Sequence, residues 1–418
     1  MNRDRRLIPL TWLVLAAALL GLGVRGLYAK RIYPTVYRPD LDGYEQLGDS
    51  LYERGELALV PGQPTSAREP GYPLLIASLY LLSGGRRAWV VLVAQALMCL
   101  SIAAMIGTLG RELFGDGVGA AAFAVYMIYP QSIYYSASLY RDTFVSFLFT
   151  AAVWCAVRAA RSRTEGIDLA LSGLSAGVFL IASTAAGVAG VGACAAALLI
   201  SDRVRCIRRA ALFLLPVLLI SGVWTARNWG LQGRLILGST NGSLEVYQAM
   251  MVDPNDLGTA RQVDFLHHDP FWNSVLHLPE SQRNAAMIRE TIAIVRARPA
   301  LYTRRVAVRV LKLWRLWPYN RSYDESYRSV FLISLASDAW MVPFGLLGFI
   351  FLRRRWREAP AVWLSVLGLT GFFAALHAVI RYRLPLMGFV ILSAVALIAA
   401  ALERLQGVST ASRTRRAS

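Results

Sequence analysis

Long apolar runs separated by short, Arg-rich connections dominate this sequence. A bilayer's hydrocarbon core is about 30 Å thick, which a helix of about 20 residues crosses. Lipid offers no hydrogen-bond partner to a free backbone N–H or C=O, so such runs must be helical. Charged residues make up only 17% of the chain, whereas soluble domains have about 25%. The sequence therefore predicts an all-α polytopic membrane protein.

Ten membrane-spanning helices are expected. The first, Leu7–Val24, is interpreted as a retained helix because no small-residue cleavage site and soluble domain follow it, as they would after a signal peptide. The Gly- and Ala-rich stretch 168–201 predicts either a hairpin of two helices or one long helix, with close helix packing. The expected spans are 7–25, 87–109, 118–137, 140–158, 168–183, 185–201, 209–225, 330–352, 359–379 and 385–402.

The basic connections predict the orientation of these spans. With ten spans, all of them fall on one side, which the positive-inside rule assigns to the cytoplasm of an inner (plasma) membrane protein. They hold Arg3, Arg5, Arg6, Arg158, Arg161, Arg163, Arg203, Arg205, Arg208, Arg209, Arg353, Arg354, Arg355, Arg357, Arg413, Arg415 and Arg416. The opposite face receives two long loops, 27–86 and 226–329. It also receives the turns Tyr134–Asp142 and His377–Pro385.

Three parts of the chain follow from this topology. Residues 1–225 form an N-terminal transmembrane module with the first outer loop, 226–329 form an extracytoplasmic loop, and 330–418 hold the last helices and a basic cytoplasmic tail. In the extracytoplasmic loop, Pro299 divides a helical pattern into two amphipathic helices. The second has apolar residues on one face and Arg or Lys over much of the rest, which indicates an interfacial helix. Contact with a lipid-linked substrate and simple surface anchoring both fit this pattern.

Composition excludes several classes of protein. The net charge of +18 is assigned to topology and to anionic headgroups, because no RNA-binding or zinc-finger spacing supports contact with nucleic acid. The four cysteines lie outside the large polar loops and form no CxxC motif, which argues against a disulfide framework. His267-His268-Asp269 lacks further ligands for a metal ion. Asn241-Gly-Ser243 is interpreted as a turn.

Carboxylates in the first outer loop are candidate general bases. Asp40 and Asp42 precede Tyr44, soon after the first span, and a carboxylate at a membrane edge can take a proton from a hydroxyl. An N-cap at the start of a helix is the structural alternative. Arg68 follows in the same loop, within Arg68-Glu-Pro-Gly-Tyr-Pro73.

Two further outer turns carry charge. Tyr135, Arg141 and Asp142 lie in the turn after the third span, where they predict either a polar-ligand site or a structural Arg–Asp pair. Arg381 and Arg383 lie before the last span. Guanidinium groups there can bind phosphate oxygens in bidentate fashion, and snorkelling anchors are the equal alternative.

Taken in order along the chain, these motifs resemble the bacterial GT-C-fold, polyprenyl-phosphate-dependent glycosyltransferases. The closest groups are the family-39-like protein mannosyltransferases and the aminoarabinose transferase of lipid A. The resemblance covers most of residues 1–402 and rests on four features: the Asp-containing loop before Tyr44, Arg68-x-Pro-Gly-Tyr-Pro73, Pro130…Tyr135-Ser136…Asp142, and Arg381-Tyr-Arg383-x-Pro385.

The resemblance implies a bundle of about ten transmembrane helices and a first-loop aspartate as catalytic base. Asp40 matches by its position four residues before Tyr44, with Asp42 as the competing choice. The family often has Glu where this chain has Asp142. The base would activate an acceptor, which attacks the anomeric carbon with inversion. Arg68, Arg381 and Arg383 would hold the donor phosphate, with Tyr44, Tyr135, Arg141 and Asp142 in support.

The implied partners are a polyprenyl-phosphate-linked sugar, a glycan, lipid or protein acceptor, and the bilayer. The sequence requires no cofactor, and dependence on a divalent metal ion is an open alternative. No Walker A or GxGxxG motif is present, which fits a donor that is not a cytoplasmic nucleotide. The competing functions are an O-antigen ligase or polymerase, a lipid or sugar transporter, and a scaffolding subunit. A transporter would be expected to have inverted repeats and charged residues inside its spans. The sequence shows no clear repeat and few charges inside spans.

Overall fold

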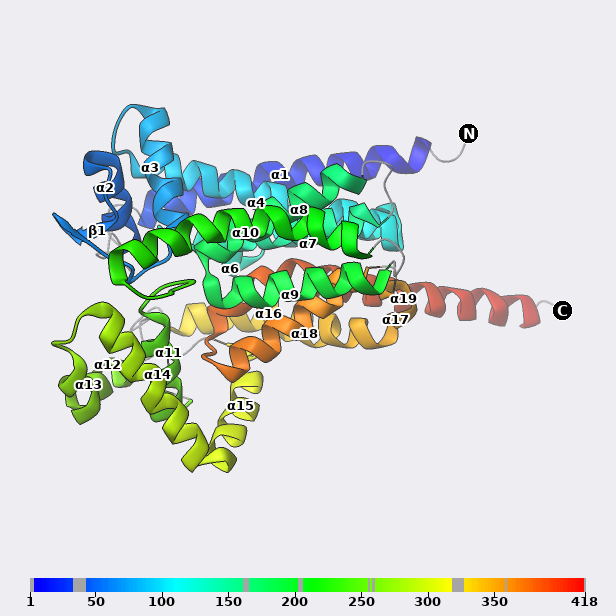
Figure 1. Ribbon diagram of the computed structural model, residues 1–418. Helices are drawn as coiled ribbons and strands as arrows, with labels where there is room; N and C mark the ends of the chain where they lie inside the picture. The colour runs from blue at the N-terminus through cyan, green and yellow to red at the C-terminus, as the bar shows by residue number, and fades with distance from the viewer. Residues whose placement is uncertain are drawn as a thin grey trace.

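The computed structural model is a bundle of long helices with a group of shorter elements packed on one end (Figure 1). It describes residues 4–32, 43–160, 165–201, 206–254, 256–257, 260–317, 327–357 and 359–416. The short elements come from the two long loops. Both chain ends lie at the other end of the bundle, as the even number of expected spans requires (Figure 1).

Each of the ten expected spans corresponds to a helix. These helices are α1 (Asp4–Ile32), α4 (Ala88–Phe114), α5 (Asp116–Met127), α7 (Asp142–Ala159), α8 (Glu165–Ala182), α9 (Thr184–Ser201), α10 (Cys206–Gln232), α16 (Tyr327–Phe351), α18 (Pro360–Ala375) and α19 (Leu384–Arg416). Within the described residues, seven helices are long and apolar enough to cross a membrane, whereas α5, α9 and α18 are shorter apolar helices. Residues 168–201 form two helices, which confirms the hairpin alternative.

The remaining elements are short. From the first loop come α2 (Tyr44–Arg54), β1 (Ala58–Val60), β2 (Gln63–Pro64) and α3 (Gly71–Ser83). The second loop supplies α11 (Gly242–Met251), α12 (Ala260–His268), α13 (Pro270–Val275), α14 (Glu280–Ala297) and α15 (Pro299–Leu313). Three connections form α6 (Pro130–Ser136), α17 (Arg353–Trp356) and the 3-10 helix η2 (Ile380–Arg383). The antiparallel pair β1–β2 is the only sheet among the described residues.

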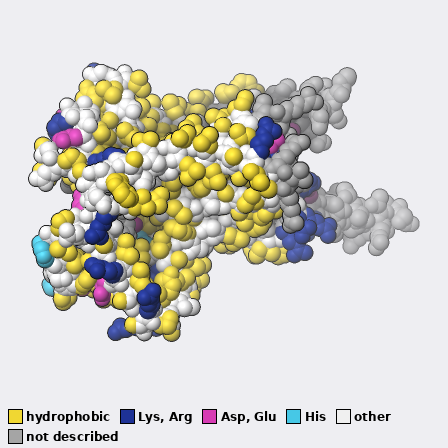
Figure 2. All heavy atoms as spheres, viewed as in Figure 1, with side chains coloured by type: hydrophobic (Ala, Val, Ile, Leu, Met, Phe, Trp, Pro, Cys, Tyr) yellow, Lys and Arg dark blue, Asp and Glu magenta, His cyan; other side chains and the backbone are white. Residues whose placement is uncertain are grey.

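Two helices form the centre of the bundle. Of the apolar windows in the candidate spans, those of α7 and α19 are 72% and 67% buried, whereas that of α1 is 17% buried. A helix that is apolar on all sides can bury all of them in a bundle core. Figure 2 shows hydrophobic side chains over the middle of the molecule, with Lys and Arg gathered toward its two ends. This distribution is the one that a bilayer requires.

Small residues allow the helices to approach closely. A Cβ added at Gly173 of α8 would lie 2.1 Å from the carbonyl oxygen of Phe213 in α10. A Cβ added at Gly345 of α16 would lie 2.5 Å from the carbonyl oxygen of Val390 in α19. In lipid, such backbone contact replaces the hydrophobic driving force that water provides elsewhere.

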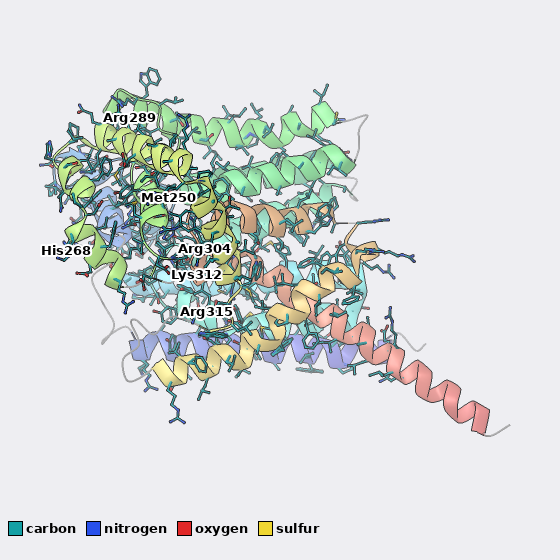
Figure 3. The ribbon with its side chains drawn as sticks, turned by 90° about the horizontal axis from the view of Figure 1, so that it is seen from below. Met250, His268, Arg289, Arg304, Lys312 and Arg315 are labelled. Carbon is teal, nitrogen blue, oxygen red and sulfur yellow. The ribbon has the colours of Figure 1, made fainter. Side chains whose placement is uncertain are left out.

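The second outer helix α15 differs from the expected interfacial helix. Pro299 begins it, as predicted. However, Arg309 is fully buried and donates to the carbonyl oxygens of Ala374, Ala375 and Leu376 at the end of α18, at 2.9–3.0 Å. Lys312, also buried, donates to the carbonyl of Leu257 at 3.0 Å. Arg309 of α15 therefore caps the end of α18, and Lys312 binds the chain before α12. Arg304, by contrast, is exposed (Figure 3).

Candidate active site

A cavity of about 480 Å³ lies between the second loop and the ends of the bundle helices that this loop covers. Its volume is within the range of about 300–1,000 Å³ that small-molecule sites occupy. Its lining comes from the α2–α3 connection, the start of α7, the α8–α9 turn, α11 with the segment before it, α14, and the chain between α18 and α19. The polar and charged lining residues include Arg68, Glu69, Arg141, Asp142, Thr184, Glu245, Asn284, Thr291, His377, Arg381 and Tyr382.

The buried carboxylate of Glu69 connects several elements at the cavity. Arg141 Nη1 donates to Glu69 Oε2 at 2.8 Å, and the backbone N–H of Thr184 donates to Glu69 Oε1 at 3.2 Å. The hydroxyl of Tyr44 donates to the same carboxylate at 3.4 Å. Arg141 also donates to the carbonyl of Ala182 at 3.1 Å. Glu69 therefore ties α2, α7 and the α8–α9 turn together at the cavity.

Sequence reasoning assigned no role to Glu69. The sequence nevertheless indicated that Glu69 needs a partner. It stands beside Arg68 and just before an apolar helix, where a carboxylate is costly to bury without one. Which guanidinium would pair with it depended on the fold.

Tyr44 lies against two of the cavity arginines. The guanidinium carbons of Arg141 and Arg68 lie 5.3 and 5.8 Å from the centroid of its ring. Such cation–π contacts place positive charge over the ring face. Tyr72 packs edge-on against the same ring, with centroids 5.9 Å apart. The ring of Tyr44 thus holds two cationic side chains close together.

Arg381, which lies in η2 far along the sequence from Arg68 and Arg141, also lines the cavity. Its guanidinium carbon lies 5.9 Å from the ring centroid of Tyr140 and 5.6 Å from that of Tyr382. Tyr135 contacts Tyr140 edge-on at 6.3 Å and is not part of the lining. Asp142, at the start of α7, does line the cavity. Arg68, Arg141, Asp142 and Arg381 are therefore brought to one site.

Arg383 lies elsewhere. It is fully buried, and its guanidinium forms a salt bridge with Asp338 of α16, which is also fully buried. Asp338 in turn accepts hydrogen bonds from the hydroxyl of Tyr129 at 3.1 Å and from Gln131 Nε2 at 2.9 Å. Arg383 also donates to the carbonyl of Arg315. The structure thus separates the two arginines expected to hold one phosphate, and only Arg381 reaches the cavity.

A second carboxylate that sequence reasoning missed is Glu245 of α11. Burial raises its pKa, whereas Arg141, Arg68 and Arg381 act in the opposite direction. Glu69 adds to the rise. A glutamate in one of several helices of a long loop has no distinguishing pattern, so only the packing of α11 against the bundle could reveal it.

The two candidate bases, Asp40 and Asp42, lie outside the described residues. Described structure resumes at Gly43, and α2 begins at Tyr44. Tyr44 contacts Arg141 and Arg68, both of which line the cavity. The described chain therefore resumes beside the cavity.

Among the residues that the structure describes, no three His, Cys, Asp or Glu side chains are placed to hold a metal ion. His268 Nδ1 lies 2.9 Å from the carbonyl oxygen of Asp264 on its own helix. Asp269 accepts from the hydroxyl of Tyr247 at 2.8 Å and caps α13 through the N–H of Trp272. The His267-His268-Asp269 sequence is thus used in helix ends.

Comparison with known proteins adds to these observations. Residues 64–229, less than half of the chain, match the family model described as dolichyl-phosphate-mannose-protein mannosyltransferase. No curated protein matches the chain. Among solved structures, the archaeal oligosaccharyltransferase AglB from Archaeoglobus fulgidus, in complex with an inhibitory peptide and a dolichol-phosphate, matches with a TM-score of 0.57 and 14% identity. The match covers 97% of this chain and 52% of that one.

Two further solved structures are also similar to this chain. The apo form of the Archaeoglobus fulgidus oligosaccharyltransferase matches with a TM-score of 0.57 and 13% identity, over 97% of this chain and 52% of that one. ArnT from Cupriavidus metallidurans, bound to undecaprenyl phosphate, matches at 14% identity over 92% of this chain and 78% of that one, with a TM-score of 0.44. This chain spans about half the length of the oligosaccharyltransferase. The expected resemblance to GT-C glycosyltransferases is confirmed at the level of the fold.

Proposed function

We propose that this membrane protein of GT-C fold is a glycosyltransferase that moves a hexose or pentose from a polyprenyl-phosphate donor to an acceptor on the extracytoplasmic face. The observation that carries the proposal is the cavity itself, which combines two surfaces that such a donor needs. One is cationic and holds Arg68, Arg141 and Arg381. The other is apolar and open.

The apolar side of the cavity supports a lipid-linked donor in particular. Val188, Leu235, Leu237, Ile288 and Ile292 line the cavity, and each of these side chains is between 44% and 66% exposed. Exposed aliphatic side chains beside a charged pocket are typical of a binding site for an amphipathic molecule. A lipid phosphate places its chain against the apolar surface and its phosphate against the cationic surface.

The chemistry follows from these surfaces. A guanidinium binds phosphate oxygens and stays charged, so Arg381 and Arg68 stabilise the negative charge that grows on the departing lipid phosphate. The acceptor hydroxyl or amine attacks the anomeric carbon from the face opposite the phosphate, which inverts the configuration. The bond between that carbon and the phosphate oxygen breaks, and the acceptor proton passes to Asp40 or Asp42.

The relatives support the same donor class. The oligosaccharyltransferase that shares the fold was solved with a dolichol-phosphate, and the matching family model is described by a dolichyl-phosphate-linked mannose. A glycan, lipid or protein acceptor fits the site equally. The positive-inside rule supports an extracytoplasmic position for the cavity, because the Arg-rich helix α17 lies at the other end of the bundle (Figure 1).

A transfer assay in membranes tests the proposal. Vesicles containing the protein receive a radiolabelled polyprenyl-phosphate sugar and an acceptor extract. We expect transfer by the wild type, loss of at least about 100-fold in Asp40→Asn or Asp42→Asn, as for removal of a general base, and loss in Arg381→Met. The matched control is Arg304→Met, because Arg304 is exposed on α15 and outside the cavity (Figure 3).

Four results test separate parts of the proposal. Full activity in both aspartate variants removes the first-loop base. Movement of the labelled lipid across the bilayer without transfer assigns the protein to transport. Addition of EDTA decides metal dependence, and undiminished transfer in its presence is expected. Protease digestion of the outer loop in intact spheroplasts, with loss of transfer, places the site on the extracytoplasmic face.

A further inference from the structure

His377 is a buried polar side chain that the reaction above does not use. It lies in the turn between α18 and η2, is 7% exposed, and lines the cavity. Among the described residues, neither of its ring nitrogens has a hydrogen-bond partner. Buried polar groups are nearly always paired, and an unpaired one destabilises the folded state. A polar group kept unpaired at a cavity wall therefore points to a ligand.

The surroundings of His377 keep the imidazole neutral. Burial, together with the positive charges of Lys312, Arg381 and Arg309, lowers its pKa to about 3. Arg309 and Lys312 are themselves bonded to backbone carbonyls. A neutral imidazole offers one N–H donor and one nitrogen acceptor. The group that matches it best is one that both donates and accepts.

That requirement distinguishes the two polar parts of a lipid-linked sugar. The phosphate has oxygens that only accept when it is fully ionised, so it would leave the acceptor nitrogen of His377 unpaired. A sugar hydroxyl donates and accepts, as the imidazole does. The arginines supply the charge that the phosphate needs, and His377 adds none.

The neighbouring rings give the same indication. The ring of Tyr382 lies 5.7 Å from that of His377 and stacks on Phe373 at 4.9 Å. All three residues line the cavity. Together they form a wall with apolar ring faces and one neutral polar group, next to Arg381. Such a wall suits the C–H faces and hydroxyls of a pyranose or furanose.

We propose that His377 binds a hydroxyl of the donor sugar and so makes the site recognise the sugar separately from its lipid phosphate. This inference rests on the function proposed above. It assigns His377 to sugar recognition, whereas Arg381 is assigned to the phosphate. The two residues should therefore respond differently when the sugar is removed from the ligand.

Binding of two ligands to purified protein tests this assignment. One ligand is a polyprenyl-phosphate sugar and the other is the same polyprenyl phosphate without sugar. We expect His377→Phe to weaken binding of the first about five- to tenfold, as loss of one or two neutral hydrogen bonds requires, and to leave binding of the second unchanged. Arg381→Met should weaken both. His377→Gln, whose amide keeps a donor and an acceptor, should retain most of the affinity for the sugar ligand.

Thermal unfolding of the ligand-free protein gives an independent readout. Because His377 is unpaired without ligand, His377→Phe should unfold at the same or a higher temperature than the wild type. Unchanged affinity of His377→Phe for the sugar ligand overturns the inference, as does an equal loss for both ligands. If His377→Phe fails to fold, weak sugar binding by a folded His377→Gln overturns it instead. A wild type that binds neither ligand refutes the proposed function, and the inference with it.

Discussion

Arg381 and Arg383 look equivalent in the sequence, yet the structure predicts opposite consequences of replacing them. The side chain of Arg383 and its partner carboxylate on Asp338 are both 0% exposed. Replacing Arg383 by Met leaves that carboxylate buried among neutral donors, which include the hydroxyl of Tyr129 and the amide of Gln131. Removing one partner of a buried ion pair costs about 3–5 kcal/mol. We therefore expect Arg383→Met to lower the free energy of unfolding by about that amount.

Arg381→Met should change the same free energy by about 1 kcal/mol or less, because its half-buried guanidinium lies at the cavity, over the rings of Tyr140 and Tyr382. Its effect should appear in donor binding. A double variant, Asp338→Leu with Arg383→Met, removes both buried charges, and we expect it to regain most of the stability that the single variant loses.

The cysteines supply the assay. Cys99, Cys155 and Cys194 are buried and free. In detergent, a thiol-reactive dye will therefore label these three cysteines only as the bundle opens. The temperature at which half of them are labelled reports the stability of the protein. Wild-type stability in Arg383→Met would refute the reasoning. So would a double variant that is no more stable than the single one, because then the unpaired charge is not what destabilises the protein.

Three further predictions concern other parts of the chain. Burial and a neighbouring carboxylate raise the pKa of Glu45 from 4.5 to about 7, so the stability that its neutral form supports is complete below pH 4.5 and lost as pH rises through 7. Glu45→Gln should match the wild type in thermal stability at pH 4 and exceed it at pH 8. Gly173→Ala should lower stability by about 1–3 kcal/mol, because the added Cβ meets the backbone of α10, whereas Gly166→Ala, with nothing within 4 Å of the added Cβ, should not; thermal unfolding of both compares them. Arg309→Met removes the bonds that hold α15 to the end of α18 and should speed proteolysis within the second loop, measured against Arg304→Met.

Lipid makes the helices of such a chain predictable. Every backbone N–H and C=O inside a bilayer must find its hydrogen-bond partner within the helix itself. An apolar run of sufficient length therefore forms a helix. The ten expected spans each appear as a helix, and the break at Pro299 follows from the missing N–H of proline. The basic side chains of α15 were less predictable, because water, headgroups and buried carbonyls all accept hydrogen bonds from Arg.

The site was only partly predictable for a similar reason. Topology placed Arg68, Asp142 and Arg381 on one side of the membrane, and the structure brings them to one cavity. Arg383 differs from Arg381 because residues two apart in a 3-10 helix do not share a face. Asp338 had a signal, since a carboxylate within an apolar span needs a partner. Glu245 and His377 had none, because their places depend on how the second loop packs against the bundle.

The range of sequence that lines the cavity has a consequence for the synthesis of the protein. Its wall begins with Arg68 and ends with Pro385, at the start of the last helix. A ribosome-bound chain that stops before residue 380 lacks both the part of the wall formed by Arg381 and Tyr382 and helix α19, one of the two central helices of the bundle. The cavity therefore gains its full lining only after residues as far as Pro385 have been synthesised and α19 has packed against α7, so a shorter chain carries an incomplete cavity.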